Sequence, residues 1–178
     1  MSTGIERKPT VLISQAQVRE AVRKLAAQIR QDYKGEQLVL VGILKGSFVF
    51  MADLVRELKI PVQVDFVKLS SYGCGTESSG EIKLRQRLGT RIRGANVVIV
   101  EDIIDTGLTV NFLLDYLKKK GPRSVKVCAL LDKPARRKIE VPVDYLGYTV
   151  PNKFVVGYGL DFDEKFRNLP FIGVMRGR

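Results

Sequence analysis

The chain has 178 residues, of which 45% are hydrophobic and 28% are charged, as in ordinary globular proteins. It contains no apolar run of the roughly 18 residues that a membrane span needs and no signal-like start, so we expect one cytoplasmic domain, residues 1–178. A formal charge of +11, with no histidine, predicts attraction to polyanions such as nucleic acids, nucleotides or pyrophosphate.

The first predicted elements are a short strand at 10–14 and a helix after it. Ser14 and Gln17 form a capping-box pattern at the start of this helix. Four apolar residues between positions 18 and 29 share one of its faces, and Gly35 follows as a stop.

Strands and helices then alternate along the chain. The other predicted strands lie at 37–44, 62–72, 81–85, 97–100, 125–131, 144–149, 154–157 and 171–175. The other predicted helices cover 47–59 and 108–120, the second with lysines in its last turn and Gly121 after it. Several strands are apolar throughout, which indicates an α/β fold with a mainly parallel twisted sheet flanked by helices. In such sheets the ligand binds beyond the carboxyl ends of the strands.

The stretch VVIVEDIIDTGLT, residues 97–109, brings three carboxylates to that end of the sheet. Glu101 and Asp102 leave the predicted strand, and Asp105 follows shortly after. Buried acids are costly unless something binds them. The stretch therefore predicts a ligand that carries hydroxyl groups or a metal ion.

The next residues, Thr106, Gly107 and Thr109, form a turn into a helix, where backbone N–H groups favour a phosphate. Two other phosphate motifs are excluded by spacing. GILKGSF (42–48) is not a nucleoside-triphosphate loop, and GCGTES (73–78) fails the dinucleotide pattern at its last position.

The stretch 97–109 resembles the phosphoribosyl-pyrophosphate motif of type I phosphoribosyltransferases. Further matches narrow the resemblance to the 6-oxopurine branch, the hypoxanthine-guanine phosphoribosyltransferases: GILKGSF (42–48), SSYG (70–73), LLDKP (130–134) and KFVVGYGLDFDEKFRNLP (153–170). The resemblance runs from about residue 10 to the C-terminus. It implies the type I phosphoribosyltransferase fold, a small hood subdomain built from the N- and C-terminal segments, and a flexible lid loop at about 70–82.

The resemblance also implies roles at the phosphate end of the site. Asp105 corresponds to the general base that takes or orients a proton of the purine imidazole ring. The residues implied to bind ribose and the 5′-phosphate are Glu101, Asp102, Asp105, Thr106, Gly107, Leu108 and Thr109. Leu108 departs from relatives that carry lysine there, and we expect little effect because backbone amides and hydroxyls hold the phosphate.

Other positions are implied to bind magnesium, pyrophosphate and the base. The implied metal ligands are Glu101, Asp102 and Asp161, and the implied cofactor is Mg²⁺. The implied pyrophosphate contacts are Lys45 and Gly46, after a non-proline cis peptide bond, and Arg167. The implied purine contacts are Lys133 at the 6-oxo group, Phe154 stacked on the ring, Val155 and Asp161. Ser71 and Tyr72 belong to the implied lid.

The resulting hypothesis is a purine-salvage enzyme that converts hypoxanthine, and also guanine, with phosphoribosyl pyrophosphate to the nucleotide and pyrophosphate. We expect a homodimer or homotetramer that binds neither membranes nor a specific nucleic acid. The alternative is an RNA-binding regulator on the same fold, of the pyrimidine-operon attenuator type. The basic clusters at 83–93, 117–123 and 133–138 would suit such a regulator, although each is also explained by a solvated surface.

Overall fold

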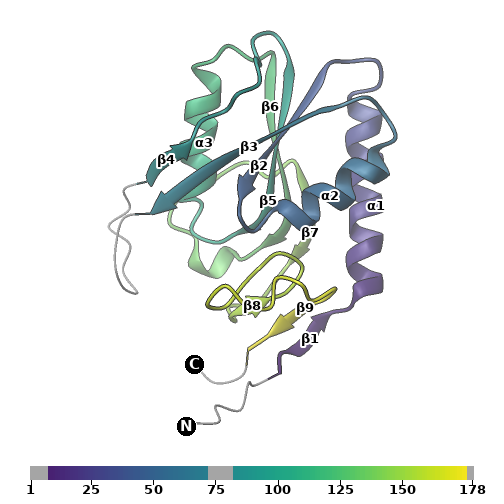
Figure 1. Ribbon diagram of the computed structural model, residues 1–178, viewed down its shortest axis with the longest axis vertical. Coiled ribbons are helices and arrows are strands. Elements are labelled where there is room, and N and C mark those ends of the chain that lie inside the picture. The colour runs from purple at the N-terminus through teal and green to yellow at the C-terminus, as the bar shows by residue number, and fades with distance from the viewer. Residues whose placement is uncertain (1–7, 72–81, 176–178) are drawn as a thin grey trace.

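The computed structural model describes residues 8–71 and 82–175 (Figure 1). Its strands are β1 (Thr10–Ile13), β2 (Leu38–Leu44), β3 (Gln63–Ser71), β4 (Ile82–Gln86), β5 (Asn96–Ile104), β6 (Ser124–Asp132), β7 (Tyr145–Thr149), β8 (Val155–Val156) and β9 (Ile172–Val174). Its helices are α1 (Gln15–Asp32), α2 (Phe48–Leu58), α3 (Leu108–Lys118) and the short 3₁₀ helix η1 (Pro134–Arg136). Ser71 ends β3, whereas Tyr72 and most of the predicted lid lie outside the described residues.

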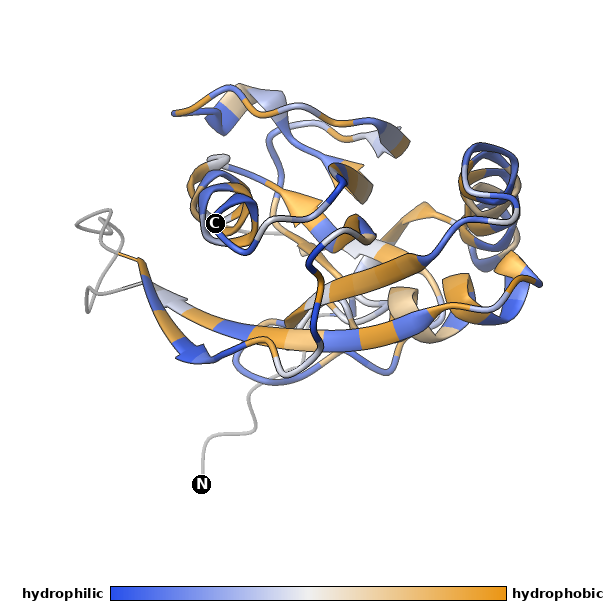
Figure 2. Cartoon of the chain, turned by 90° about the horizontal axis from the view of Figure 1, so that it is seen from above, coloured by the Kyte–Doolittle hydropathy of each residue, from blue (hydrophilic) through white to orange (hydrophobic). Residues whose placement is uncertain are grey.

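Six strands form the central sheet in the order β4-β3-β2-β5-β6-β7. The five strands from β3 to β7 in this order are parallel to one another, and β4 pairs antiparallel with β3. Figure 2 shows the hydrophobic strands between α3 on one side and α1 and α2 on the other. The predicted α/β sheet covered on both faces is confirmed. Within the described ranges, no helix is both long and apolar enough to cross a membrane.

Local signals explain where the helices begin and end. The Ser14 side chain accepts from the Gln17 backbone N–H, and the Gln17 side chain accepts from the Ser14 N–H, so the predicted capping box is present. The apolar face of α1 is buried against the sheet and α2. α3 stops at Lys118, so Lys119 and Lys120 follow the helix instead of forming its last turn.

β5 is longer than the sequence indicates. We expected a strand at 97–100 that ends before Glu101, but β5 continues to Ile104. The extension exists because β6 stays paired with β5 along its whole length, whereas pairing with β2 stops at Val100. Glu101 and Asp102 therefore lie within the strand, just beyond the end of its pairing with β2.

A second, antiparallel sheet contains β1, β9 and β8 in that order. It joins the N-terminal segment to the C-terminal one, and Figure 1 shows it below the central sheet. These are the segments that the resemblance assigns to a hood.

Candidate active site

Glu101 and Asp102 are buried carboxylates, with 7% and 8% of their surface exposed. Glu101 Oε2 has no hydrogen-bond partner among the described residues. Burial, helped by the neighbouring Asp102 charge, raises the pKa of Glu101 well above its usual value. Burial also raises the pKa of Asp102 to about 6. Two desolvated carboxyl groups side by side favour a bound cation or hydroxyl donors.

The turn after β5 has the geometry of an anion-binding helix start. Gly107 has φ +83°, and a Cβ there would overlap the Ile139 carbonyl, so glycine is needed on both counts. The Thr106 carbonyl accepts two backbone hydrogen bonds, of 2.9 and 3.1 Å, from the segment after η1. α3 begins immediately, with Leu108 and Thr109 in its first turn. The segment after η1 therefore fixes the turn in place, and the backbone N–H groups at the start of α3 follow it directly.

Asp105 is held by two arginines from the segment 136–137. Arg136 Nη1 lies 3.2 Å from Asp105 Oδ2, and Arg137 Nη1 donates to the Asp105 carbonyl at 3.0 Å. Arg137 also pairs with Asp132 at the end of β6. Asp105 Oδ1 is buried and has no hydrogen-bond partner within the described ranges. One oxygen of this carboxylate thus remains as an acceptor.

Lys133 is buried beside Asp105. Only 6% of the residue is exposed, and its backbone N–H donates to the Ile104 carbonyl at 2.9 Å. Burial lowers the pKa of Lys133, and the charge of Asp105 acts in the opposite direction, which places the two groups within electrostatic reach. A buried ammonium donor therefore feels the charge of a half-buried carboxylate, one oxygen of which is buried and free to accept.

An aromatic surface lies on the C-terminal segment. Phe154 is 40% exposed and packs edge-to-face on Phe162, with the ring centroids 5.5 Å apart. Val155, the next residue, is buried in β8. An exposed ring face held by an aromatic neighbour can stack on a planar ligand.

Arg167 lies in the C-terminal loop, residues 157–171 between β8 and β9, and its charge acts on the acids of β5. Its Nη1 donates to the Gly159 carbonyl at 2.7 Å, and its Nη2 lies 2.8 Å from Asp161 Oδ1. The other Asp161 oxygen accepts from the Glu164 backbone N–H at 2.9 Å. Arg167 lowers the pKa of Asp102 and Asp161 raises it, so both charges act on the buried pair.

The loop after β2 packs tightly against these elements. The peptide bond between Leu44 and Lys45 is cis, as the resemblance implies. A Cβ at Gly46 would overlap the Asp102 carboxylate, and a Cβ at Gly159 would overlap the Gly46 carbonyl. The structure thus brings this loop, the β5 acids and the C-terminal loop into direct contact.

Comparisons with known proteins identify the family of the chain. A sequence profile of the phosphoribosyl transferase domain matches residues 13–163. A hypoxanthine-guanine phosphoribosyltransferase of Streptococcus pneumoniae is 50% identical over 166 residues, which cover 93% of this chain and 92% of that protein. The chain belongs to the hypoxanthine-guanine branch of the phosphoribosyltransferases. The family resemblance and the fold predicted from the sequence are confirmed.

Other relatives of this phosphoribosyltransferase differ in length. A hypoxanthine phosphoribosyltransferase structure from Staphylococcus aureus matches with a TM-score of 0.91 and 40% identity, and covers 99% of this chain and 97% of that one. The bifunctional protein TilS/HprT of Listeria monocytogenes is 46% identical over 93% of this chain, which spans only 26% of that protein.

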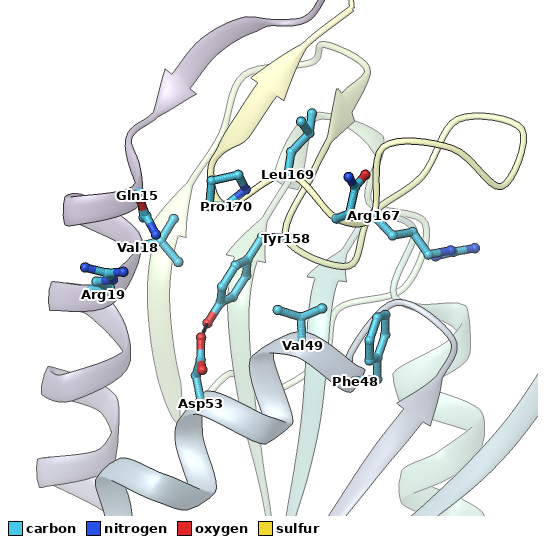
Figure 3. A pocket seen from close by; sticks show the side chains of 11 residues that line it. Gln15, Val18, Arg19, Phe48, Val49, Asp53, Tyr158, Arg167, Leu169 and Pro170 are labelled. Carbon is cyan, nitrogen blue, oxygen red and sulfur yellow. Dashed lines mark hydrogen bonds between the residues drawn. The ribbon is translucent and has the colours of Figure 1, made fainter.

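Arg167 also lines a pocket of about 590 Å³ between α1, α2 and the C-terminal loop (Figure 3). The Tyr158 hydroxyl donates to Asp53 of α2 at 2.5 Å across this pocket. This bond ties the segment that carries Gly159 to α2, directly after the Lys45 loop. The bond therefore helps to hold the two segments that meet at Gly46 and Gly159.

Sequence reasoning missed several residues of the candidate site. Arg136 and Arg137 belong to the basic cluster at 133–138, which the sequence explains equally as a solvated surface or as one that binds polyanions. Glu164, which contacts two basic side chains, looked like an ordinary exposed acid. The only sequence signal for these residues was that Arg136 stands three positions after Lys133. The ion pairs that they form depend on how separate loops fold together, which no local pattern shows.

The acids of the candidate site fit a magnesium ion in part. Glu101 and Asp102 offer hard oxygen ligands, and the orphaned Glu101 oxygen would gain a partner. In the described part of the chain, however, no three acidic, histidine or cysteine side chains cluster closely enough to hold a metal ion. A magnesium ion would therefore need further ligands from substrate and water, as Mg²⁺ commonly does.

Proposed function

We propose that this protein transfers the phosphoribosyl group of phosphoribosyl pyrophosphate to hypoxanthine and guanine. The observation that carries the proposal is the buried Lys133 beside the half-buried Asp105, whose buried Oδ1 has no hydrogen-bond partner within the described ranges. A lysine ammonium only donates hydrogen bonds, and an ionised carboxylate only accepts them. A 6-oxopurine presents the complementary pattern, with an acceptor at its 6-oxo group and a donor at an imidazole nitrogen.

The phosphate end of the substrate would bind at the start of α3. We assign the 5′-phosphate to the backbone N–H groups and hydroxyls of Thr106, Gly107, Leu108 and Thr109. Leu108 contributes its backbone, so the absence of a lysine there matters little. We assign the ribose hydroxyls to Glu101 and Asp102, whose desolvated oxygens favour hydroxyl donors.

The pyrophosphate group would lie between the loop after β2 and Arg167. Backbone N–H groups of Lys45 and Gly46 can donate to phosphate oxygens, and a planar guanidinium can bind two of them. Mg²⁺, held by Glu101, Asp102 and Asp161 together with the substrate, would supply positive charge that balances the pyrophosphate. Asp161 would have to release one of its contacts with Arg167 or Glu164 in order to take part.

The base would stack on Phe154, with the backbone of Val155 at its edge and Asp161 nearby. Stacking on an aromatic ring contributes about 1–3 kcal/mol per base and tolerates different bases. Selection between bases must therefore come from Lys133 and from backbone groups. The 6-oxo group would accept from Lys133, and the imidazole N–H would donate to Asp105.

In the reaction, a purine ring nitrogen forms a bond to C1′ as the bond from C1′ to the pyrophosphate oxygen breaks. The electron pair of the broken bond leaves with pyrophosphate. The proton released from the imidazole ring is taken or oriented by Asp105. General bases of this kind contribute about 10²–10⁴-fold to rate.

The test is nucleotide formation from phosphoribosyl pyrophosphate and hypoxanthine or guanine, with MgCl₂ and with excess EDTA. We expect turnover on both bases that requires the metal. The competing RNA-binding function is not favoured by the family assignment, and a filter-binding titration tests it separately. Tight, sequence-specific RNA binding at physiological salt would support it, whereas weak, salt-sensitive binding would reflect only the charge of +11.

We also propose a cytoplasmic homodimer or homotetramer. Phe48 and Val11 are exposed apolar side chains, with 45% and 53% of their surface accessible, and could contribute to a subunit contact. Light scattering coupled to size-exclusion chromatography measures the assembly directly, and a monomer at micromolar concentration would contradict it.

A further inference from the structure

One carboxylate oxygen contacts both basic side chains at the proposed pyrophosphate position. Lys45 Nζ lies 2.8 Å from Glu164 Oε2, and Arg167 Nη2 lies 3.4 Å from the same oxygen. Lys45 and Arg167 are 119 and 3 residues from Glu164 along the chain. The fold therefore brings two cations from separate loops onto one anionic oxygen.

The backbone holds Glu164 in this position. Its φ is +60°, in the left-handed region that is uncommon outside glycine, and its N–H donates to Asp161 Oδ2 at 2.9 Å. Asp163 and Phe166 are also left-handed, with φ of +52° and +73°. This closed turn carries the Glu164 side chain back towards Lys45 and Arg167.

The ion pair between Glu164 and Lys45 forms in the free protein but is weak enough for another anion to displace Glu164. The hydrogen bond from Lys45 lowers the pKa of Glu164, so the carboxylate is ionised at neutral pH. The Glu164 and Lys45 side chains are 64% and 53% exposed, and exposed ion pairs are weak. Pyrophosphate carries more negative charge than one carboxylate and can displace it.

We propose that Glu164 competes with pyrophosphate for Lys45 and Arg167. Its carboxylate binds both cations in the free protein, leaves them when pyrophosphate or phosphoribosyl pyrophosphate binds, and returns as pyrophosphate departs. Glu164 thereby weakens product binding and speeds product release. The inference rests on the proposed function, because it requires that Arg167 and the Lys45 loop bind pyrophosphate. It adds that the Lys45 ammonium, as well as the backbone N–H, contacts the pyrophosphate.

Titration calorimetry with inorganic pyrophosphate in fixed excess MgCl₂ tests this role. Glu164→Gln keeps the shape of the side chain and removes its charge, and we expect pyrophosphate to bind about three- to tenfold more tightly. Stopped-flow displacement should show a correspondingly slower release. Asp163→Asn is the matched control, since Asp163 is the adjacent exposed acid and makes no ion pair within the described ranges. We expect it to change affinity less than twofold.

Three results would refute the proposal that Glu164 competes with pyrophosphate. They are unchanged affinity in Glu164→Gln, weaker binding in Glu164→Gln, or equal tightening in Glu164→Gln and Asp163→Asn, which would reflect net charge alone. Arg167→Ala separates this failure from that of the site assignment. If pyrophosphate binds Arg167→Ala as tightly as wild type, the assigned pyrophosphate site is wrong and the competition falls with it. If Arg167→Ala weakens binding while Glu164→Gln has no effect, only the competition is wrong.

Discussion

The binding role proposed for Asp102 comes at a cost to stability, so Asp102→Asn should make the free protein more stable at neutral pH. The wild-type side chain is buried at the end of the β2–β5 pairing, and burial raises its pKa from 3.8 to about 6. An asparagine has nearly the same shape, and its amide oxygen can still accept the hydrogen bonds from the Ile103 and Asp102 backbone N–H groups. Only the desolvated charge is removed.

The pKa shift sets the size and the pH dependence of the effect. The unfolded chain loses this proton near pH 3.8 and the folded chain only near pH 6, so the folded state binds more protons in between. Stability therefore falls as pH rises through this window, and the full cost is present above it. At 1.36 kcal/mol per pKa unit, the cost is about 3 kcal/mol. We expect Asp102→Asn to gain about 1–3 kcal/mol at pH 7.5 and almost nothing at pH 4.

The assay is thermal unfolding in EDTA between pH 4 and 8, where a gain of this size raises Tm by about 3–9 °C at pH 7.5. Asp115→Asn, an exposed position on α3, is the control and should leave Tm unchanged. The same Asp102→Asn protein should bind phosphoribosyl pyrophosphate more weakly, because stability and function oppose each other at this site. A loss of stability at pH 7.5, or a gain of equal size at pH 4, would refute the reasoning.

Three further substitutions test other parts of the site and fold. Gly46→Ala places a Cβ on the Asp102 carboxylate, so KM for phosphoribosyl pyrophosphate should rise at least about tenfold. Gly89→Ala is the control, because its Cβ would lie 3.7 Å from the nearest neighbouring atom, and it should match wild type. Equal effects of the two substitutions would refute the steric argument. Asp105→Asn should lower kcat by about 10²–10⁴ while substrate binding survives, and near-normal kcat would remove Asp105 from catalysis. Ser14→Ala breaks the capping box and should lower stability by about 1 kcal/mol without changing kcat; unchanged unfolding would mean that the cap contributes nothing.

The sequence predicts the layers of the fold well because they depend on local pattern. Apolar runs mark the buried strands, and the pair Ser14 and Gln17 marks the start of α1. The length of β5 is different, because Glu101 and Asp102 resemble the polar end of a strand. Whether the backbone stays extended through them is decided by β6, which is far along the chain.

The candidate site also has a part that the sequence predicts and a part that it does not. The acids and the phosphate turn stand within one short stretch, so their neighbourhood follows from the sequence. The Arg136–Asp105 and Glu164–Lys45 ion pairs join separate loops, and nothing local distinguishes these side chains from a solvated basic or acidic surface. Their positions follow only from how the segments after β6 and β8 close over the end of the sheet.

The central claim is that buried Lys133 selects a 6-oxopurine, and the ratio of kcat/KM for hypoxanthine to that for adenine tests it most directly. Adenine presents an amino group where hypoxanthine has its 6-oxo group, so donor would face donor and the buried ammonium would lose its partner. Sites built around such a hydrogen bond reject mismatched analogues by about 10⁴ or more. We predict a ratio of at least about 10³ for the wild type, which Lys133→Met lowers mainly by reducing the hypoxanthine rate. A wild-type enzyme that used adenine within about tenfold of hypoxanthine would contradict both the role of Lys133 and the assignment to 6-oxopurines.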